Sequence, residues 1–213
     1  MVLVRRGETD RAGGPFSPLA RVDPTGSAGA SLVEVAIVLA VTSCLIAISL
    51  PVLINGAEAR RTRDAASFLA GQFRLARQRA VMTGHHVAIV FDDVSGEAGW
   101  RLCEDGDRDG LSRGDITSGK DRCQELAQPL SFRYPQVSIG YVPGVPSPDG
   151  EVGASPLRFG LTQMAVFTPT GTASTGTVAV RGPGANQFAV RVSGVTGRTR
   201  VLRFDPGRRE WTE

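Results

Sequence analysis

One acidic residue lies inside a long apolar segment, and its position suggests a specific role. Across residues 32–54, Glu34 is the only carboxylate, and there is no Lys, Arg or His. About 20 apolar residues span the hydrocarbon core of a bilayer, so this run is long enough to cross a membrane. A charged group in lipid is costly and calls for a partner. We predict that Glu34 either pairs with a positive group or is protonated in the membrane.

Alternating aspartates form a second candidate site. Asp105, Asp107 and Asp109 occupy alternate positions and Gly110 follows them, as at the start of a calcium-binding loop. Position twelve of such a loop is a bidentate Glu, and Ile116 stands there instead. Two interpretations stay open: a Ca²⁺ site, or a solvated loop bounded by a disulfide.

The cysteines indicate an oxidising compartment for part of the chain. Cys103 and Cys123 flank the acidic segment, whereas Cys44 falls in the apolar run. Disulfides persist outside the cytoplasm, so we predict a Cys103–Cys123 disulfide in preference to two free thiols. Closing a loop of about 20 residues would stabilise the fold by roughly 3 kcal/mol.

The C-terminal part of the chain is basic. Residues 181–213 contain seven arginines and three acids, and Arg198 and Arg200 would share one face of a strand. Guanidinium groups suit phosphate oxygens, and such binding would depend strongly on salt. The alternatives are a solvated strand face, or a DNA-binding surface made of Arg198, Arg200 and the nearby Arg203.

No enzyme site is evident from the residue types. His85 and His86 are the only histidines, and they stand where a strand should begin. No metal-binding Cys/His set, phosphate loop or nucleophile with a base nearby is present in the pattern. We therefore expect a protein that is not an enzyme.

The elements that position these residues follow from periodicity. Residues 1–29 contain four arginines and several Gly and Pro, so they resemble a cytoplasmic leader and not folded structure. Residues 30–54 form the expected transmembrane helix, which Pro51 would kink. In residues 55–84, apolar side chains recur every three or four positions, which predicts an amphipathic continuation ending near Gly84.

The remaining residues, 85–213, have the short alternating runs and Gly/Pro turns of a β-rich domain. The first expected feature is a hairpin of 85–91 and 99–103 across Ser95-Gly96. Further strands are expected at 130–134, 137–142, 157–160, 165–167, 177–181, 187–193, 198–204 and 209–212. One long helix followed by antiparallel strands gives an α+β fold, with the helix packed on the sheet domain.

The start of the apolar run resembles the cleavage and methylation signature of type IV pilins and pseudopilins. Gly29 precedes the cut, Ala30 becomes the new N-terminus where the family usually has Phe, and Glu34 is the fifth mature residue. Pro51 is the twenty-second. The resemblance implies processing by prepilin peptidase, and pairing of Glu34 with the α-amino group of a neighbouring subunit. An ordinary signal-anchor helix is the alternative.

Later segments are similar to the GspH/FimT group of minor pseudopilins. They comprise 75–80, Gly84 and the strand after it, 167–172, 176–178, and 192–200 with its Gly-Arg-x-Arg sequence. The resemblance implies a single-pass inner-membrane subunit with a periplasmic domain. Such a subunit would assemble with other pseudopilins or pilins in the filament of a type II secretion system or a type IV pilus, and would contact other subunits or secreted cargo. A FimT-like pilin that binds DNA for uptake is the rival, and a tethered calcium-binding domain outside any filament is a third option.

Overall fold

A computed structural model describes residues 31–124 and 126–213, and it leaves the side chains of residues 50–55 undescribed. The chain divides into two units, Met1–Leu45 and Ile46–Glu213. The first element, α1 (Leu32–Thr83), runs through that division as one continuous helix. The expected boundary between residues 54 and 55 therefore falls inside a helix.

The N-terminal part of α1 has the composition of a membrane span. Residues Leu32–Ser49 form an 18-residue apolar segment of which none is buried. The hydroxyl of Thr42 donates to the carbonyl of Val38 at 2.8 Å, so this polar group is satisfied within the helix. Internal pairing of this kind suits a segment surrounded by hydrocarbon.

The later part of α1 belongs to the second unit and buries one face. Its buried residues recur at three- and four-residue spacing, as the sequence predicts: Thr62, Ala65, Ala66, Leu69, Ala70, Phe73, Ala76 and Ala80. The helix ends at Thr83 because Gly84 adopts the left-handed conformation, with φ of +71°, and its N–H bonds to the carbonyl of Ala80. This end of the helix confirms the expected one.

A first antiparallel sheet is built on the predicted hairpin. Strand β1 (Val87–Val94) pairs along its whole length with β2 (Glu97–Glu104), so that Phe91 lies opposite Trp100. The strand order is β3 (Arg122–Cys123), β2, β1 and β7 (Met164–Phe167), and β4 (Gln128–Pro129) also pairs with β2. The hairpin and its turn are confirmed, and both strands are longer than expected.

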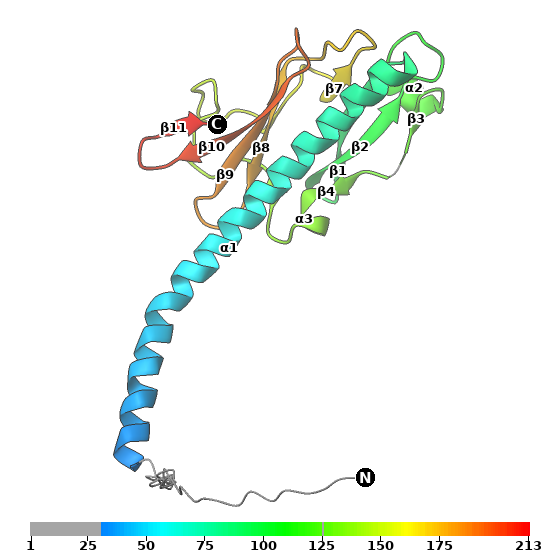
Figure 1. Ribbon diagram of the computed structural model, residues 1–213. Coiled ribbons are helices and arrows are strands. Elements are labelled where there is room, and N and C mark those ends of the chain that lie inside the picture. The colour runs from blue at the N-terminus through cyan, green and yellow to red at the C-terminus, as the bar shows by residue number, and fades with distance from the viewer. Residues whose placement is uncertain (1–30, 125) are drawn as a thin grey trace, which may run out of the picture. The chain divides into compact units, whose positions relative to one another are not determined.

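The second sheet is also antiparallel and comes from the C-terminal half. Its order is β11 (Glu210–Thr212), β10 (Thr199–Asp205), β9 (Gln187–Val192), β8 (Gly176–Arg181) and β5 (Ser138–Ile139), and β6 (Leu157–Arg158) pairs with β8. Figure 1 shows α1 crossing in front of strands of both sheets. The α+β architecture that the sequence predicts is thus confirmed.

The core of the second unit is aromatic and centres on Phe73. The ring of Phe73, which is fully buried, lies 5.8 to 6.3 Å from the rings of Phe91, Phe159 and Phe167. Small residues on α1 let the helix approach the strands closely, and the rings fill the remaining space. One hydrophobic cluster therefore joins α1 with strands of both sheets.

One expected strand is wrong. Residues 130–134 form the short helix α3 (Leu130–Arg133), in which the N–H of Tyr134 bonds to the carbonyl of Leu130 at 2.8 Å. Leu130 is buried, whereas Phe132 is 79% exposed. The alternation of residue types resembled a strand, but Pro129 precedes the segment, and the apolar residues do not share one buried face. A second short helix, α2 (Arg113–Ser118), lies in the acidic segment.

Candidate functional site

Glu34 lies in the first turn of α1, on a helical segment whose large apolar side chains are exposed. Val33 is 67% exposed and Ile37 is 58% exposed, and Glu34 itself is exposed. Soluble monomers do not leave a continuous apolar segment of this length open to water. An exposed apolar segment of this length fits a membrane-anchored protein, and Glu34 is the only carboxylate in it.

The other residues of the predicted processing signature lie outside the described part of the chain. Gly29 and Ala30 precede the first described residue, Ser31, and the side chain of Pro51 is also not described, although the residue lies within α1. Ser31 stands immediately before the helix, and its carbonyl accepts the N–H of Val35 at 3.1 Å. The predictions for Gly29, Ala30 and Pro51 stay predictions.

The acidic loop brings its three aspartates together. The carboxylates of Asp105, Asp107 and Asp109 lie within 4.8 Å of one another. Asp105 is buried, and its oxygens accept the N–H groups of Arg108 at 2.7 Å and Gly110 at 3.1 Å. These bonds show that Asp105 also organises the backbone of the loop.

A lysine also reaches this group. The ammonium of Lys120 lies 3.7 Å from Asp107 and 3.4 Å from Asp115. A hydrogen bond from Ser112 lowers the pKa of Asp115, and a hydrogen bond shared with Asp107 raises the pKa of Asp109. Lys120 thus supplies positive charge where a cation would sit, and calcium binding here stays a prediction.

The structure joins Cys103 to Cys123 in a disulfide, at the register where β2 and β3 pair. The disulfide closes the segment that contains the acidic loop and α2. A second buried carboxylate, Asp121, lies two residues before Cys123 and accepts the N–H groups of Gly106 and Ser112. The loop is therefore held by one covalent bond and by hydrogen bonds to two buried aspartates.

The C-terminal arginines do not form one surface. Arg198 and Arg200 are exposed on either side of the buried Thr199, as expected for alternate positions. Arg200 is paired with Glu213, and Arg203 has the opposite parity on β10, so it extends from the other face. The structure therefore does not bring the three arginines of the DNA-binding alternative together.

The structure explains why a glycine stands at the start of the Gly-Arg-x-Arg sequence. Gly197 has φ of +61°, and a Cβ atom there would lie 2.4 Å from the carbonyl oxygen of Gly171 and 2.6 Å from Nε of Arg77. That same nitrogen of Arg77 donates to the carbonyl of Gly171 at 2.9 Å. An arginine on α1 thus connects two loops of the C-terminal half, and both loops need glycine beside it.

A buried glutamine was not anticipated from the sequence. Gln187 is 1% exposed, its amide nitrogen lies 3.1 to 3.2 Å from the carbonyl oxygens of Gly140, Val180 and Phe188, and its amide oxygen accepts the N–H of Val142. It fixes the loop after β5 on the second sheet. A lone Gln at the start of an apolar strand is the only signal that could have indicated it.

Comparisons with known proteins identify the family. The family model described as type II transport protein GspH matches residues 65–197, which is more than half of the chain. Among solved structures, the minor pseudopilin EpsH from the Type 2 Secretion System of Vibrio cholerae is similar at 11% identity, over 67% of this chain and 97% of that one, with a TM-score of 0.42. At that score the likeness adds nothing to the family match, and no curated protein matches the sequence. The match to the GspH family also does not favour the DNA-binding alternative. The chain belongs to the GspH family of type II transport proteins.

Proposed function

We propose that prepilin peptidase cuts this minor pseudopilin after Gly29 and that the mature chain joins the pseudopilus of a type II secretion system. The observation that carries the proposal is the exposed apolar segment Leu32–Ser49 with Glu34, its single carboxylate, near the start. Pseudopilins assemble with one another in a filament. In the filament, the apolar segments pack against one another and no longer against lipid. An acid at a fixed position in each segment can then set the register between neighbouring subunits.

Glu34 would pair with the α-amino group of Ala30 in the neighbouring subunit. That amine exists only after cleavage, so processing creates the partner of the carboxylate. Removing one member of an ion pair in a medium of low dielectric constant leaves the other charge uncompensated, which costs about 3–5 kcal/mol. Loss of Glu34 should therefore impair assembly far more than it impairs membrane insertion.

The proposed orientation places the β-rich unit in the periplasm. Arg5, Arg6, Arg11 and Arg21 precede the apolar segment, and arginines of this kind are retained on the cytoplasmic side of a membrane. The disulfide of Cys103 and Cys123 suits an oxidising compartment on the opposite side. In this orientation the β-rich unit would contact other pseudopilins or secreted cargo.

Incorporation of a Glu34→Gln variant into filaments tests the proposal. The variant and the unchanged chain would be produced in cells that contain the secretion machinery, and the amount in membranes and in sheared filaments would be measured. We expect normal membrane insertion and a drop of about tenfold or more in the filament fraction. The reason is that the cost of about 3–5 kcal/mol for an uncompensated charge exceeds the roughly 1.4 kcal/mol that corresponds to a tenfold change. Asp64→Asn, which removes an exposed acid from the same helix, is the matched control and should assemble normally. Equal incorporation of Glu34→Gln and the unchanged chain would contradict the proposal.

A further inference from the structure

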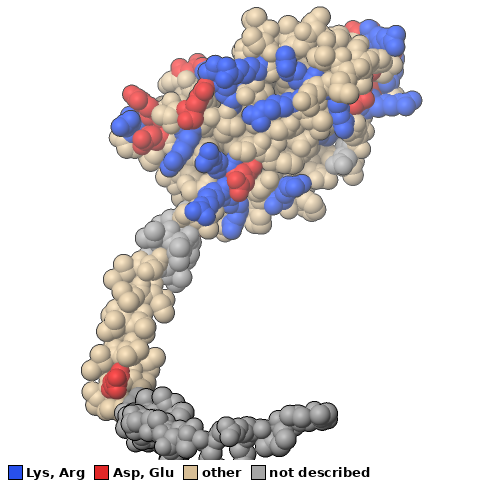
Figure 2. Space-filling view, in the orientation of Figure 1, with Lys and Arg blue, Asp and Glu red and all other residues tan. Residues whose placement is uncertain are grey.

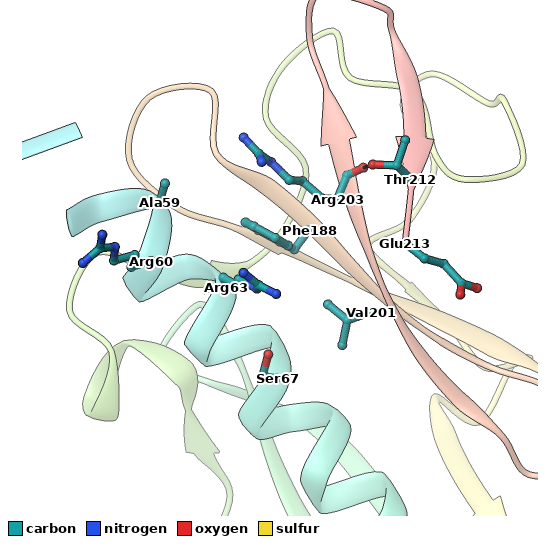
Figure 3. A pocket seen from close by; sticks show the side chains of 9 residues that line it. All are labelled: Ala59, Arg60, Arg63, Ser67, Phe188, Val201, Arg203, Thr212 and Glu213. Carbon is teal, nitrogen blue, oxygen red and sulfur yellow. Dashed lines mark hydrogen bonds between the residues drawn. The ribbon is translucent and has the colours of Figure 1, made fainter. Parts of the chain in front are cut away.

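A cleft in the second unit carries three arginines that the proposed assembly does not use. It has a volume of about 410 Å³ and lies between α1, the strands β9 and β10, and the end of β11. Its lining comprises Ala59, Arg60, Arg63, Ser67, Phe188, Val201, Arg203, Thr212 and Glu213. Figure 3 shows Arg63 extending from α1 towards β10, and Arg203 extending from β10 towards the side where α1 lies.

The positive charge of this cleft is not neutralised within the described chain. None of the ion pairs among the described residues includes Arg60, Arg63 or Arg203. The one acid in the lining, Glu213, is paired with Arg200. Figure 3 shows Arg60 extending from α1 away from β9 and β10, so the guanidinium groups of Arg63 and Arg203 are the ones that can meet an anion in the hollow. Arginine binds phosphate oxygens through two parallel hydrogen bonds.

The cleft also has an apolar floor and hydroxyl groups. Phe188 is 5% exposed and Val201 is half-buried, and both contribute to the floor together with Ala59. The hydroxyl of Thr212 donates to the carbonyl of Arg203 at 3.4 Å, drawn in Figure 3, and Ser67 lies on α1 beside the cleft. A ligand with a charged phosphate and an apolar remainder fits this lining better than a small inorganic anion does.

The position of the cleft along α1 indicates which class of phosphate compound could bind there. Arg60 lies six residues beyond the end of the apolar run at residue 54, which is about 9 Å of helix. The headgroup layer extends roughly 5–8 Å beyond each side of the hydrocarbon core. A long arginine side chain can reach the polar layer of a membrane from a position just outside it, so the N-terminal side of the cleft lies within reach of that layer.

The surface near the cleft is also positively charged. Figure 2 shows Lys and Arg side chains gathered on the part of the second unit where α1 enters it, with few acids among them. Basic groups next to a membrane are attracted to anionic lipids. A positively charged surface of this kind would attract lipid phosphates to the cleft.

We propose that the cleft between Arg63 and Arg203 binds the headgroup phosphate of an anionic phospholipid and so docks the β-rich unit on the membrane surface before assembly. The proposal rests on the membrane orientation described under the proposed function. The lipid must leave the cleft when the subunit moves from the membrane into a filament. The cleft therefore distinguishes the membrane-bound pool of this subunit from the assembled one.

Native mass spectrometry of the full chain in a neutral detergent tests the proposal. The chain is mixed with equal amounts of phosphatidylglycerol and phosphatidylcholine of the same acyl composition, and the retained lipids are counted. Each basic residue near an anionic surface strengthens binding by about fivefold, so we expect at least tenfold preference for phosphatidylglycerol. The double variant Arg63→Gln/Arg203→Gln should lose about 25-fold in affinity, by the same reasoning for two residues.

A matched control variant distinguishes the effect of the cleft arginines from the effect of a lower net charge. Arg198→Gln/Arg208→Gln removes two exposed arginines outside the cleft lining and should retain the preference. Circular dichroism and thermal unfolding of both double variants check that each is folded. Equal retention of the two lipids, or an equal loss in both double variants, would overturn the proposal.

Competition with two other ligands tests whether the cleft binds something other than a lipid. Inorganic phosphate that displaces phosphatidylglycerol at equal concentration would assign the cleft to a free anion, and a glutamate-rich peptide that does so would assign it to a protein partner. Either result would overturn the lipid proposal. Because the experiment uses neither peptidase nor filament, its failure leaves filament assembly untouched, and failed incorporation of the subunit leaves lipid binding untouched.

Discussion

Replacing Phe73 by Ala should destabilise the second unit more than most single substitutions in this chain. Phe73 is 0% exposed, and its ring contacts those of Phe91 on β1, Phe167 on β7, and Phe159, which directly follows β6. Truncating a buried Phe to Ala costs about 3–5 kcal/mol, since the lost transfer free energy is joined by a cavity term. Domains of this size have a free energy of unfolding of about 5–15 kcal/mol, so the variant would lose a large part of its stability.

Urea unfolding of the full chain in detergent, followed by tryptophan fluorescence, measures this loss. Trp100 lies 5.7 Å from the ring of Phe68 on α1, so its fluorescence reports whether the helix is packed on the first sheet. Val81→Ala, at a position that is 51% exposed on the same helix, is the matched control and should change stability by less than about 0.5 kcal/mol. A loss below about 1 kcal/mol for Phe73→Ala, with an unchanged denaturant slope, would show that α1 does not organise the core in the way described.

Three further predictions concern the glycine beside Arg77, a half-buried tyrosine and the acidic loop. Gly197 and Gly184 have nearly equal φ values of +61° and +63°, but only Gly197 has atoms within 4 Å of an added Cβ. Thermal unfolding should therefore show Gly197→Ala to be less stable than Gly184→Ala by about 1–3 kcal/mol, and equal midpoints would refute the close approach. Burial raises the pKa of the Tyr141 hydroxyl, which is buried without a hydrogen-bond partner in the described chain. Stability from this group is complete below the unfolded pKa of about 10 and falls as the pH rises above it, so Tyr141→Phe should flatten the alkaline decline, and an unchanged decline would contradict this. Lys120 competes with a cation for Asp107 and Asp115, so calorimetry should find tighter calcium binding by Lys120→Gln than by the unchanged chain. Equal affinity would contradict the competition by Lys120, and no heat with either protein would count against a calcium site.

Local patterns predicted the elements that depend on local physics. The end of α1 followed from Gly84, because only glycine adopts the left-handed conformation without cost. The β1–β2 hairpin followed from alternating residues around Ser95 and Gly96, where both residues have positive φ. The buried face of α1 followed from apolar spacing, because the period of a helix is fixed.

Features that depend on distant contacts were not predictable in this way. The role of Gln187 depends on Gly140 and Val142, which lie more than forty residues away in the chain. The basic cleft joins Arg60 and Arg63 with Arg203, which lies on another element. The sequence alone groups Arg203 with Arg198 and Arg200 in the DNA-binding alternative, but the parity of β10 puts Arg203 on the other face. Residues 130–134 resemble a strand in sequence because a segment of five residues is too short for its apolar periodicity to distinguish a helix from a strand.

The central claim is that this chain is a processed pseudopilin, and cleavage tests it most directly. The full chain would be produced with and without prepilin peptidase, and intact mass and N-terminal sequence would be measured. The account predicts that the peptidase removes residues 1–29 and leaves Ala30 at the N-terminus, and that Gly29→Trp blocks this. A chain that keeps its first 29 residues in the presence of active peptidase, or that is cut elsewhere, would contradict the claim.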